Sequence, residues 1–358
     1  MAIPKKIRSF LQFILFTGVG VLILVMVYKS QNAAYIAECA LKGIPDSECS
    51  LMEKLKSDFA SVNYYWIAAI IVAFVISNLL RAHRWLLLIK TMGTHGRMSN
   101  AFFTIMVGYF ANMGLPRVGE VVRAGLFARY EKIGPEKVMG TIVVDRILDL
   151  LSLLFAIVLA IILQGNVLLT FFQEEMGDSV LGKTWLYVLI FLGILFLMVL
   201  YRYRRIVKKW SLYHKIQHLV EGFRDGLSSL RRVEKPWILI LDTALIWLMY
   251  YLMMFLCFYS FQPTAHLGGM AGLMVFVFGG LGIVFPSPGG MGTFHLMVIT
   301  ALSIYGINGD DAFSFANIQY FSVQLLGCML IGIIGLIVLP IINKNSKTNV
   351  PNPDPGKL

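Results

Sequence analysis

The chain has 358 residues, of which 58% are apolar and only 14% are Asp, Glu, Lys or Arg. A soluble globular protein carries roughly a quarter charged residues, so this composition excludes an ordinary soluble domain. The net charge of +11 accompanies no module of interleaved aromatic and basic residues, and we therefore expect no nucleic-acid partner.

Long uncharged segments predict an all-α polytopic membrane protein. Several stretches approach or exceed the roughly 20 residues that cross a bilayer core as a helix. They are Phe10–Tyr28, Phe59–Leu80, Leu150–Phe172, Trp185–Tyr201, Trp237–Tyr259 (interrupted only by Asp242) and Ala312–Asn343. None alternates like a strand, and a backbone in hydrocarbon must satisfy its own hydrogen bonds. We therefore expect about six full transmembrane helices rather than a barrel.

The amino-terminal region predicts a retained span followed by an outer loop. Lys5, Lys6 and Arg8 precede the first apolar segment, but its length and the lack of a small-residue cleavage motif argue against a cleaved signal. The loop that follows contains Cys39 and Cys49. A disulfide and two unpaired thiols both remain open there.

Basic residues predict the orientation of the chain. With the amino terminus in the cytoplasm, the predicted outer segments are 29–62, 164–183, 261–268 and 306–312. Of the 31 Lys and Arg residues, these segments hold only Lys29, Lys42, Lys54, Lys56 and Lys183. Lys and Arg concentrate on the cytoplasmic side of membrane proteins, so we expect both termini in the cytoplasm.

Two apolar segments do not read as simple spans. Ser99–Pro116 is uncharged, contains Asn112 and Pro116, and has basic residues on both sides, which predicts a re-entrant hairpin from the cytoplasmic face. Leu267–Phe294 ends in a run rich in proline and glycine that must break a helix. The run contains Pro286, Pro288, Gly289, Gly290 and Gly292. The outer loops around it predict a second hairpin that dips from outside.

The order of spans and hairpins predicts an inverted repeat within a single membrane domain, 1–343. The two halves are about 59–163 and 237–342, and broken segments at corresponding positions indicate a transport site near the midplane. Between them, 204–232 reads as a basic interfacial helix on anionic headgroups, or as a linker helix that packs on the protein. The tail, 344–358, is expected to be disordered.

Ionisable residues within or beside spans are candidates for function because they are costly there. Asp145 and Asp149 lie one turn apart, and Arg146 can pair with Asp149, although a structural ion pair at the membrane border is an alternative. Another group follows the first helix break: Arg117, Glu120 and Arg123. Arg81 and Arg84 end the second span, where anchoring by the positive-inside rule is the alternative.

Four short motifs together resemble the lysylphosphatidylglycerol synthase transmembrane family, which includes the flippase-like half of the multiple peptide resistance factor. The matching residues are Arg81, Arg84 and Trp85; Asn112, Pro116, Arg117, Gly119, Glu120 and Arg123; Asp145, Arg146 and Asp149; and Pro286, Pro288, Gly289, Gly290 and Gly292. The resemblance implies a protein of the plasma (inner) membrane that handles polar lipids. His295 stands where the family usually has Glu, and Asp145 is more often Glu.

The leading hypothesis from the sequence is a flippase-like translocase for a phospholipid or lipid-linked headgroup, with no cofactor, no metal and no catalytic residue. Its substrate site is expected at the motif residues above together with His295, and Arg81, Arg84 and Trp85 are headgroup or border contacts. The residues outside the membrane are too few for an aminoacyltransferase domain. Alternatives are an intramembrane enzyme that modifies lipid headgroups, using Glu120, Asp145 or His295, and a scaffold for a separate envelope-synthesis enzyme.

Overall fold

The computed structural model describes part of residues 21–39 and then residues 49–114, 118–176, 233–285 and 287–344. Every regular element in these ranges is helical. Several sequence-based expectations lie outside them: most of the first span, the span Trp185–Tyr201, the basic helix 204–232 and the tail beyond Lys344.

The first half of the chain contains a short helix, a long helix, two helices of intermediate length and a second long helix. These are α2 (Leu51–Ser61), α3 (Tyr64–Lys90), α4 (Met98–Gly114), α5 (Val118–Glu131) and α6 (Pro135–Met176). The second half contains α10 (Pro236–Ser260), α11 (Gly269–Val284), α12 (Thr293–Ser303), α13 (Gly309–Tyr320), the π-helical segment η3 (Phe321–Leu330) and α14 (Ile331–Ile342).

Four helices in the described ranges are long and apolar enough to cross a membrane. They are Tyr64–Lys90, Pro135–Phe171, Pro236–Ser260 and Gly309–Ile342, the last formed by α13, η3 and α14 without interruption. Mean hydropathy over their most apolar windows ranges from 1.8 to 2.9. The chain is therefore a polytopic helical protein.

One expected boundary is wrong. The apolar stretch Phe59–Leu80 is not one helix, because α2 ends at Ser61 and Asn63 starts α3 by accepting a hydrogen bond from Tyr65 N at 3.1 Å. The apolar stretch Leu150–Phe172 lies inside α6, which begins at Pro135 because its charged residues are paired inside the protein and so do not end the helix. Hydropathy alone sees neither a cap nor an ion pair.

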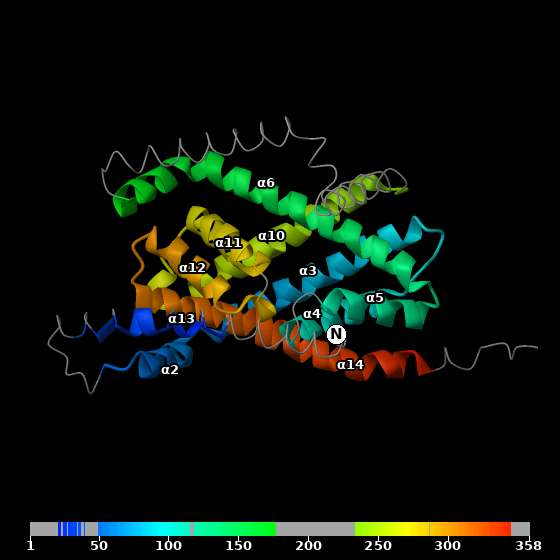
Figure 1. Cartoon of the computed structure of the whole chain (residues 1–358), viewed down its shortest axis with the longest axis horizontal. Helices are drawn as coiled ribbons and strands as arrows, with labels where there is room; N and C mark the ends of the chain where they lie inside the picture. Colours follow the sequence, from blue (N-terminus) through cyan, green and yellow to red (C-terminus); the bar gives the residue numbers. More distant parts are fainter. Residues whose placement is uncertain are drawn as a thin grey trace, which may run out of the picture.

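Two helical hairpins lie in opposite halves of the molecule along its long axis (Figure 1). In one, α4 and α5 pack against each other; in the other, α11 and α12 do so. In both hairpins the helix is interrupted at the position that the glycine and proline residues predicted. The second break contains Gly289, Gly290 and Gly292, all at positive φ, where a side chain would be strained.

The core follows the long helices. α3 packs along α10, and α14 packs on α4 (Figure 1). Large side chains fill the centre, including the fully buried Trp85, Phe127, Phe258 and Phe315. α6 packs on α5, α3 and α10, and the polar site lies among these four helices.

α2 packs beside the start of α13. Cys39 and Cys49 form a disulfide whose Cα atoms are 6.4 Å apart. Lys54 Nζ lies 2.9 Å from Asp58 and 2.6 Å from Asp311 of α13. The ion pair and the contacts between α2 and α13 fix α2 to the start of the last long helix.

Candidate functional site

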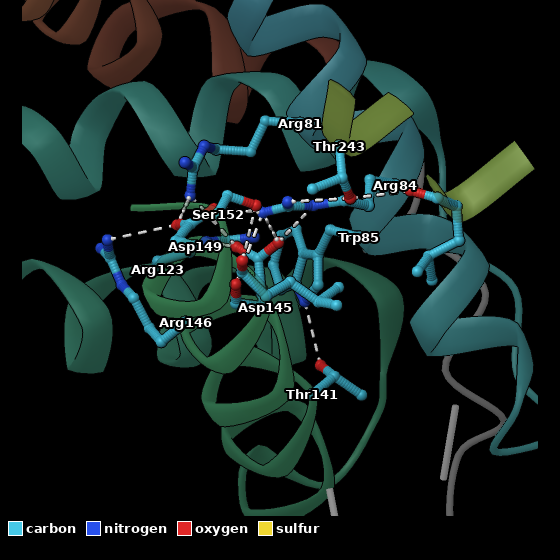
Figure 2. A network of polar contacts seen from close by, with 12 residues as sticks. Arg81, Arg84, Trp85, Arg123, Thr141, Asp145, Arg146, Asp149, Ser152 and Thr243 are labelled. Carbon is cyan, nitrogen blue, oxygen red and sulfur yellow. Dashed lines mark hydrogen bonds and ion pairs between the residues drawn. The ribbon is translucent and has the colours of Figure 1, made fainter. Parts of the chain in front are cut away.

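Buried charges gather where α3, α5, α6 and α10 meet (Figure 2). Three arginines and two aspartates form what we call the arginine–aspartate cluster. Its members are Arg81, Arg84, Arg123, Asp145 and Asp149. Each member except Asp149, at 15% side-chain exposure, is almost fully buried. Buried charges are costly in a membrane protein, which makes this cluster a candidate functional site.

Helical spacing brings the members together. Asp145 and Asp149 are four residues apart on α6, and Arg81 and Arg84 are three residues apart on α3, so each pair shares one face of its helix. Figure 2 shows the two arginines of α3 directed toward the two carboxylates of α6. The two positive charges on this face of α3 are thereby balanced by the two negative charges on the facing side of α6.

Asp145 is the centre of the cluster. Its Oδ1 accepts hydrogen bonds from Arg84 Nε at 3.0 Å and Arg84 Nη2 at 2.6 Å. Its Oδ2 lies 3.3 Å from Arg81 Nη1 and 3.2 Å from Arg123 Nη1. Asp149 accepts from Arg81 Nη1 at 2.8 Å and Arg84 Nη2 at 2.7 Å. Two carboxylates therefore serve three guanidinium groups.

α10 completes the coordination of the α3 arginines. The hydroxyl of Tyr250 accepts hydrogen bonds from Arg81 Nε at 3.2 Å and Nη2 at 2.9 Å. Thr243 Oγ1 accepts from Arg84 Nη1 at 3.3 Å. Neither residue was predicted from the sequence, because a hydroxyl inside an apolar span gives no signal of its own.

Arg123 is the least satisfied member. Its Nη1 reaches Asp145, but its Nε and Nη2 are buried without a hydrogen-bond partner in the described residues. Its guanidinium carbon lies 3.7 Å from the ring centroid of Trp85, whose Nε1 donates to Thr141 at 2.9 Å. The ring holds the guanidinium plane by a cation–π contact while leaving two donors free.

The rim of the cluster is a separate pair. Arg146 Nε lies 2.9 Å from Glu120 Oε1 in an ion pair whose angle does not make a hydrogen bond, and Arg146 Nη1 lies 3.8 Å from Asp149. The side chains of Arg146 and Glu120 are 39% and 34% exposed. The predicted pairing of Arg146 with Asp149 is present, but it is the longest ion pair of the site.

The charges inside the cluster do not balance. Among the described residues, three guanidinium groups face two carboxylates, which leaves one net positive charge in a buried volume. An unpaired buried cation costs several kcal/mol, on the order of the desolvation penalty of one ion. The site therefore favours an anion, and the free donors of Arg123 are the groups that can reach one.

Arg81 and Arg84 are not exposed anchors at a membrane border. They are 2% and 0% exposed, respectively, and both pair with the aspartates of α6. Trp85, grouped with them from the sequence, is also fully buried and contacts Arg123.

The first break places its residues around the helix turn. Asn112 Oδ1 accepts a hydrogen bond from Gly119 N at 2.7 Å, which joins the end of α4 to the start of α5. A Cβ on Gly119 would collide with the carbonyl of Gly108 and with Asn112. Pro116 and Arg117 lie outside the described residues.

The second break lies beside the end of α4 rather than in the cluster. A Cβ on Gly289 would come within 2.9 Å of the Tyr320 hydroxyl and 3.9 Å of Met113. Thr293 Oγ1 donates to Gly282 O at 2.7 Å and so ties α12 to α11. Pro286 and the side chain of Pro288 are outside the described part of the chain. The two breaks thus approach each other, although the cluster and the glycine loop are distinct.

His295 is separated from the charged cluster. It is 1% exposed, its ring centroid lies 5.0 Å from that of Tyr320, and its Nδ1 has no hydrogen-bond partner among the described residues. A second histidine, His83, makes a 2.7 Å contact with Asp242 between α3 and α10. Asp242 was visible in the sequence as the one charge of its span, but its partner was not.

The comparisons identify the family. The sequence matches the family described as Lysylphosphatidylglycerol synthase TM region over residues 50–335. The chain belongs to this family. It is also similar to the UPF0104 membrane protein of Methanocaldococcus jannaschii, with 23% identity over 311 residues that cover 78% of this chain and 85% of the relative. No solved structure matches the chain.

Family membership agrees with the fold. The matched range contains all four membrane-length helices except the carboxyl end of the last one, and it contains the whole arginine–aspartate cluster. The protein is therefore a multi-pass membrane protein of a family named for the metabolism of a membrane phospholipid.

Proposed function

We propose that the protein is a flippase-like translocase that moves a lipid with an anionic headgroup across the plasma membrane. The headgroup binds at the arginine–aspartate cluster. The observation that carries this proposal is the buried excess, within the part of the chain that the structure describes, of one guanidinium over the carboxylates, together with the two nitrogens of Arg123 that have no partner there.

A phosphate group fits this arrangement. Guanidinium donors bind phosphate oxygens through short, charge-assisted hydrogen bonds that are roughly twice as strong as neutral ones. A headgroup phosphate would take up the free Nε and Nη2 of Arg123 and cancel the net charge. Glu120, at the partly exposed rim, offers a carboxylate for a cationic part of the same headgroup.

The positions of the hairpins suggest how such a lipid would cross. The α4–α5 and α11–α12 hairpins lie in opposite halves of the molecule, and their breaks approach each other near Met113 and Gly289. In transporters with inverted halves, broken helices flank a site that alternately opens to each side. We place the α4–α5 hairpin and both termini on the cytoplasmic side and treat both hairpins as re-entrant.

The test uses purified protein in vesicles that contain a fluorescent phosphatidylglycerol, with transbilayer movement read from the fraction that dithionite can reduce. Arg123→Gln should slow this movement about 10- to 100-fold, the factor expected when one hydrogen-bonded charge is lost. Arg129→Gln is the matched control, because Arg129 is an exposed arginine of the same helix.

Equal rates for wild type, Arg123→Gln and Arg129→Gln would remove the cluster from the transport path. Phosphatidylglycerol that moves no faster in protein vesicles than in protein-free vesicles would reject the translocase itself.

A further inference from the structure

An apolar groove opens beside the arginine–aspartate cluster. It has a volume of about 900 Å³ and lies between α6, α10 and α11. Aliphatic and aromatic side chains make up most of its wall, among them Phe155, which is 68% exposed. α6 and α10 have the length and composition of membrane spans, so an open groove between them faces hydrocarbon.

One end of the groove meets the charged cluster. Thr243 and Leu148 both line the groove; Thr243 Oγ1 accepts a hydrogen bond from Arg84, and Leu148 directly precedes Asp149. Along α6 the lining extends to Leu163, a distance of about 22 Å at the helical rise. Half of a bilayer core is only about 15 Å thick. The groove is therefore long enough for the whole chain of a lipid whose headgroup lies at the cluster.

A polar atom in the wall lacks a partner. Trp247 lines the groove one turn beyond Thr243, and its Nε1 is buried without a hydrogen-bond acceptor in the described part of the chain. Buried donors are nearly always paired, so an unpaired one indicates an acceptor supplied from elsewhere. In an ester lipid, a carbonyl stands just below the phosphate, at the head of each otherwise apolar chain.

We propose that this groove holds one acyl chain of an ester-linked glycerophospholipid and that Trp247 donates a hydrogen bond to its ester carbonyl. The chain leaves the headgroup at Thr243 and follows α6 toward Leu163. This assignment rests on the proposed function for the position of the headgroup. A polyisoprenyl phosphate has no ester carbonyl, so it would leave Trp247 unpaired.

Two leucines of α10 provide the first test. Leu248 lines the groove and Leu241 does not, yet they are 46% and 47% exposed. A phosphatidylglycerol that carries a diazirine within one acyl chain is photolysed with the protein in vesicles, and the labelled peptides are mapped. Label concentrated on Leu248 and the groove side of α6 is the expected result. Equal labelling of Leu241 and Leu248 means that the lipid is only part of the surrounding bilayer and overturns the proposal.

The ester carbonyl provides the second test. Competition against the photolabel compares diester and diether phosphatidylglycerol of equal chain length, and farnesyl phosphate serves as the isoprenoid probe. Wild type should prefer the diester about two- to tenfold, the range of one neutral hydrogen bond, and Trp247→Phe should lose that preference. A preference that Trp247→Phe retains, no preference in wild type, or stronger competition by farnesyl phosphate overturns the assignment of Trp247.

A further pair of variants distinguishes the headgroup site from the groove for the acyl chain. Ala244→Phe fills the groove from an exposed position, and Leu241→Phe is its control outside the groove. If Ala244→Phe abolishes labelling of Leu248 while Arg123→Gln leaves it unchanged, the groove stands and the headgroup site of the proposed function fails. If Arg123→Gln weakens labelling and Ala244→Phe does not, the headgroup site stands and the groove proposal fails.

Discussion

Replacing Asp145 by asparagine should destabilise the protein more than any other isosteric change in the cluster. Asp145 is fully buried and contacts Arg81, Arg84 and Arg123. Asparagine keeps the volume and one oxygen but removes the charge, so the excess positive charge of the cluster rises from one to two. Breaking a buried ion pair by removing one partner costs about 3–5 kcal/mol. That is a large part of the roughly 5–15 kcal/mol that stabilises a folded protein.

The measurement is thermal unfolding in one detergent at a fixed scan rate, followed by intrinsic fluorescence, because membrane proteins often unfold irreversibly. With about 2–4 °C for each kcal/mol in a domain of 150–250 residues, Asp145→Asn should lower the midpoint by about 6 °C or more. Adding Arg84→Gln should recover part of this loss, since it restores the original excess of one positive charge. The two changes form a double-mutant cycle between residues in direct contact.

Asp242→Asn is the matched control. Asp242 is also buried, but its partner His83 has a side chain that is 48% exposed and can turn to water. The expected loss is therefore close to that of a surface pair, about 1 kcal/mol or less. If Asp145→Asn and Asp242→Asn melted within a degree or two of each other, the arginine–aspartate cluster would not be an electrostatic unit and the excess-charge reasoning would be refuted.

Two further perturbations test the hairpin and the α2 contacts. Gly119→Ala should destabilise the protein by about 1–3 kcal/mol, because the added Cβ collides with α4. Gly125→Ala is the control: its Cβ meets nothing within 4 Å, so it should be neutral or slightly stabilising. Equal melting temperatures for the two variants would contradict the packing of α5 on α4. Burial lowers the pKa of Lys54, but hydrogen bonds to Asp311 and Asp58 outweigh it and raise that pKa above its usual value. The stabilisation is therefore complete below about pH 10.4 and declines above it. Lys54→Met should lower the melting temperature at pH 9, and this difference should shrink as the pH rises toward 12; a difference that stays constant over this range would show that Lys54 acts without its charge.

Composition and helix breakers were sufficient for the outline of the fold. The long uncharged segments required helices in a membrane, and the proline and glycine residues after Phe285 required a break that the structure has between Val284 and Thr293. These are local effects of the backbone, so a single sequence carries them. The start of α3 at Tyr64 depends instead on capping by Asn63, which hydropathy does not detect.

The cluster was predicted only in part, because its members come from four helices. The four-residue spacing of Asp145 and Asp149 predicted that they share one face of a helix. Arg81 and Arg84 could not be assigned in this way, because basic residues at the end of a span ordinarily face headgroups. A polar stripe on α3 was the available signal: Asn78, Arg81 and Arg84 recur at helical spacing, and all three are buried. Nothing local distinguishes Tyr250 from the other aromatic residues of α10, and its role follows only from the packing of α3 on α10.

The continuous helix Gly309–Ile342 constrains how the two halves of the protein can evolve or be exchanged. α13 packs on α12 and α14 packs on α4, so one rod holds both hairpins. Its register is fixed by notches: a Cβ on Gly332 would come within 2.8 Å of the Met106 carbonyl, and one on Gly327 within 3.1 Å of the Phe74 ring. A chimera that joins halves of two relatives must keep the spacing between these notches, including the wider turns of η3. Insertion of a single residue between Phe321 and Gly327 would rotate α14 by about 100° and turn the Gly332 notch away from α4.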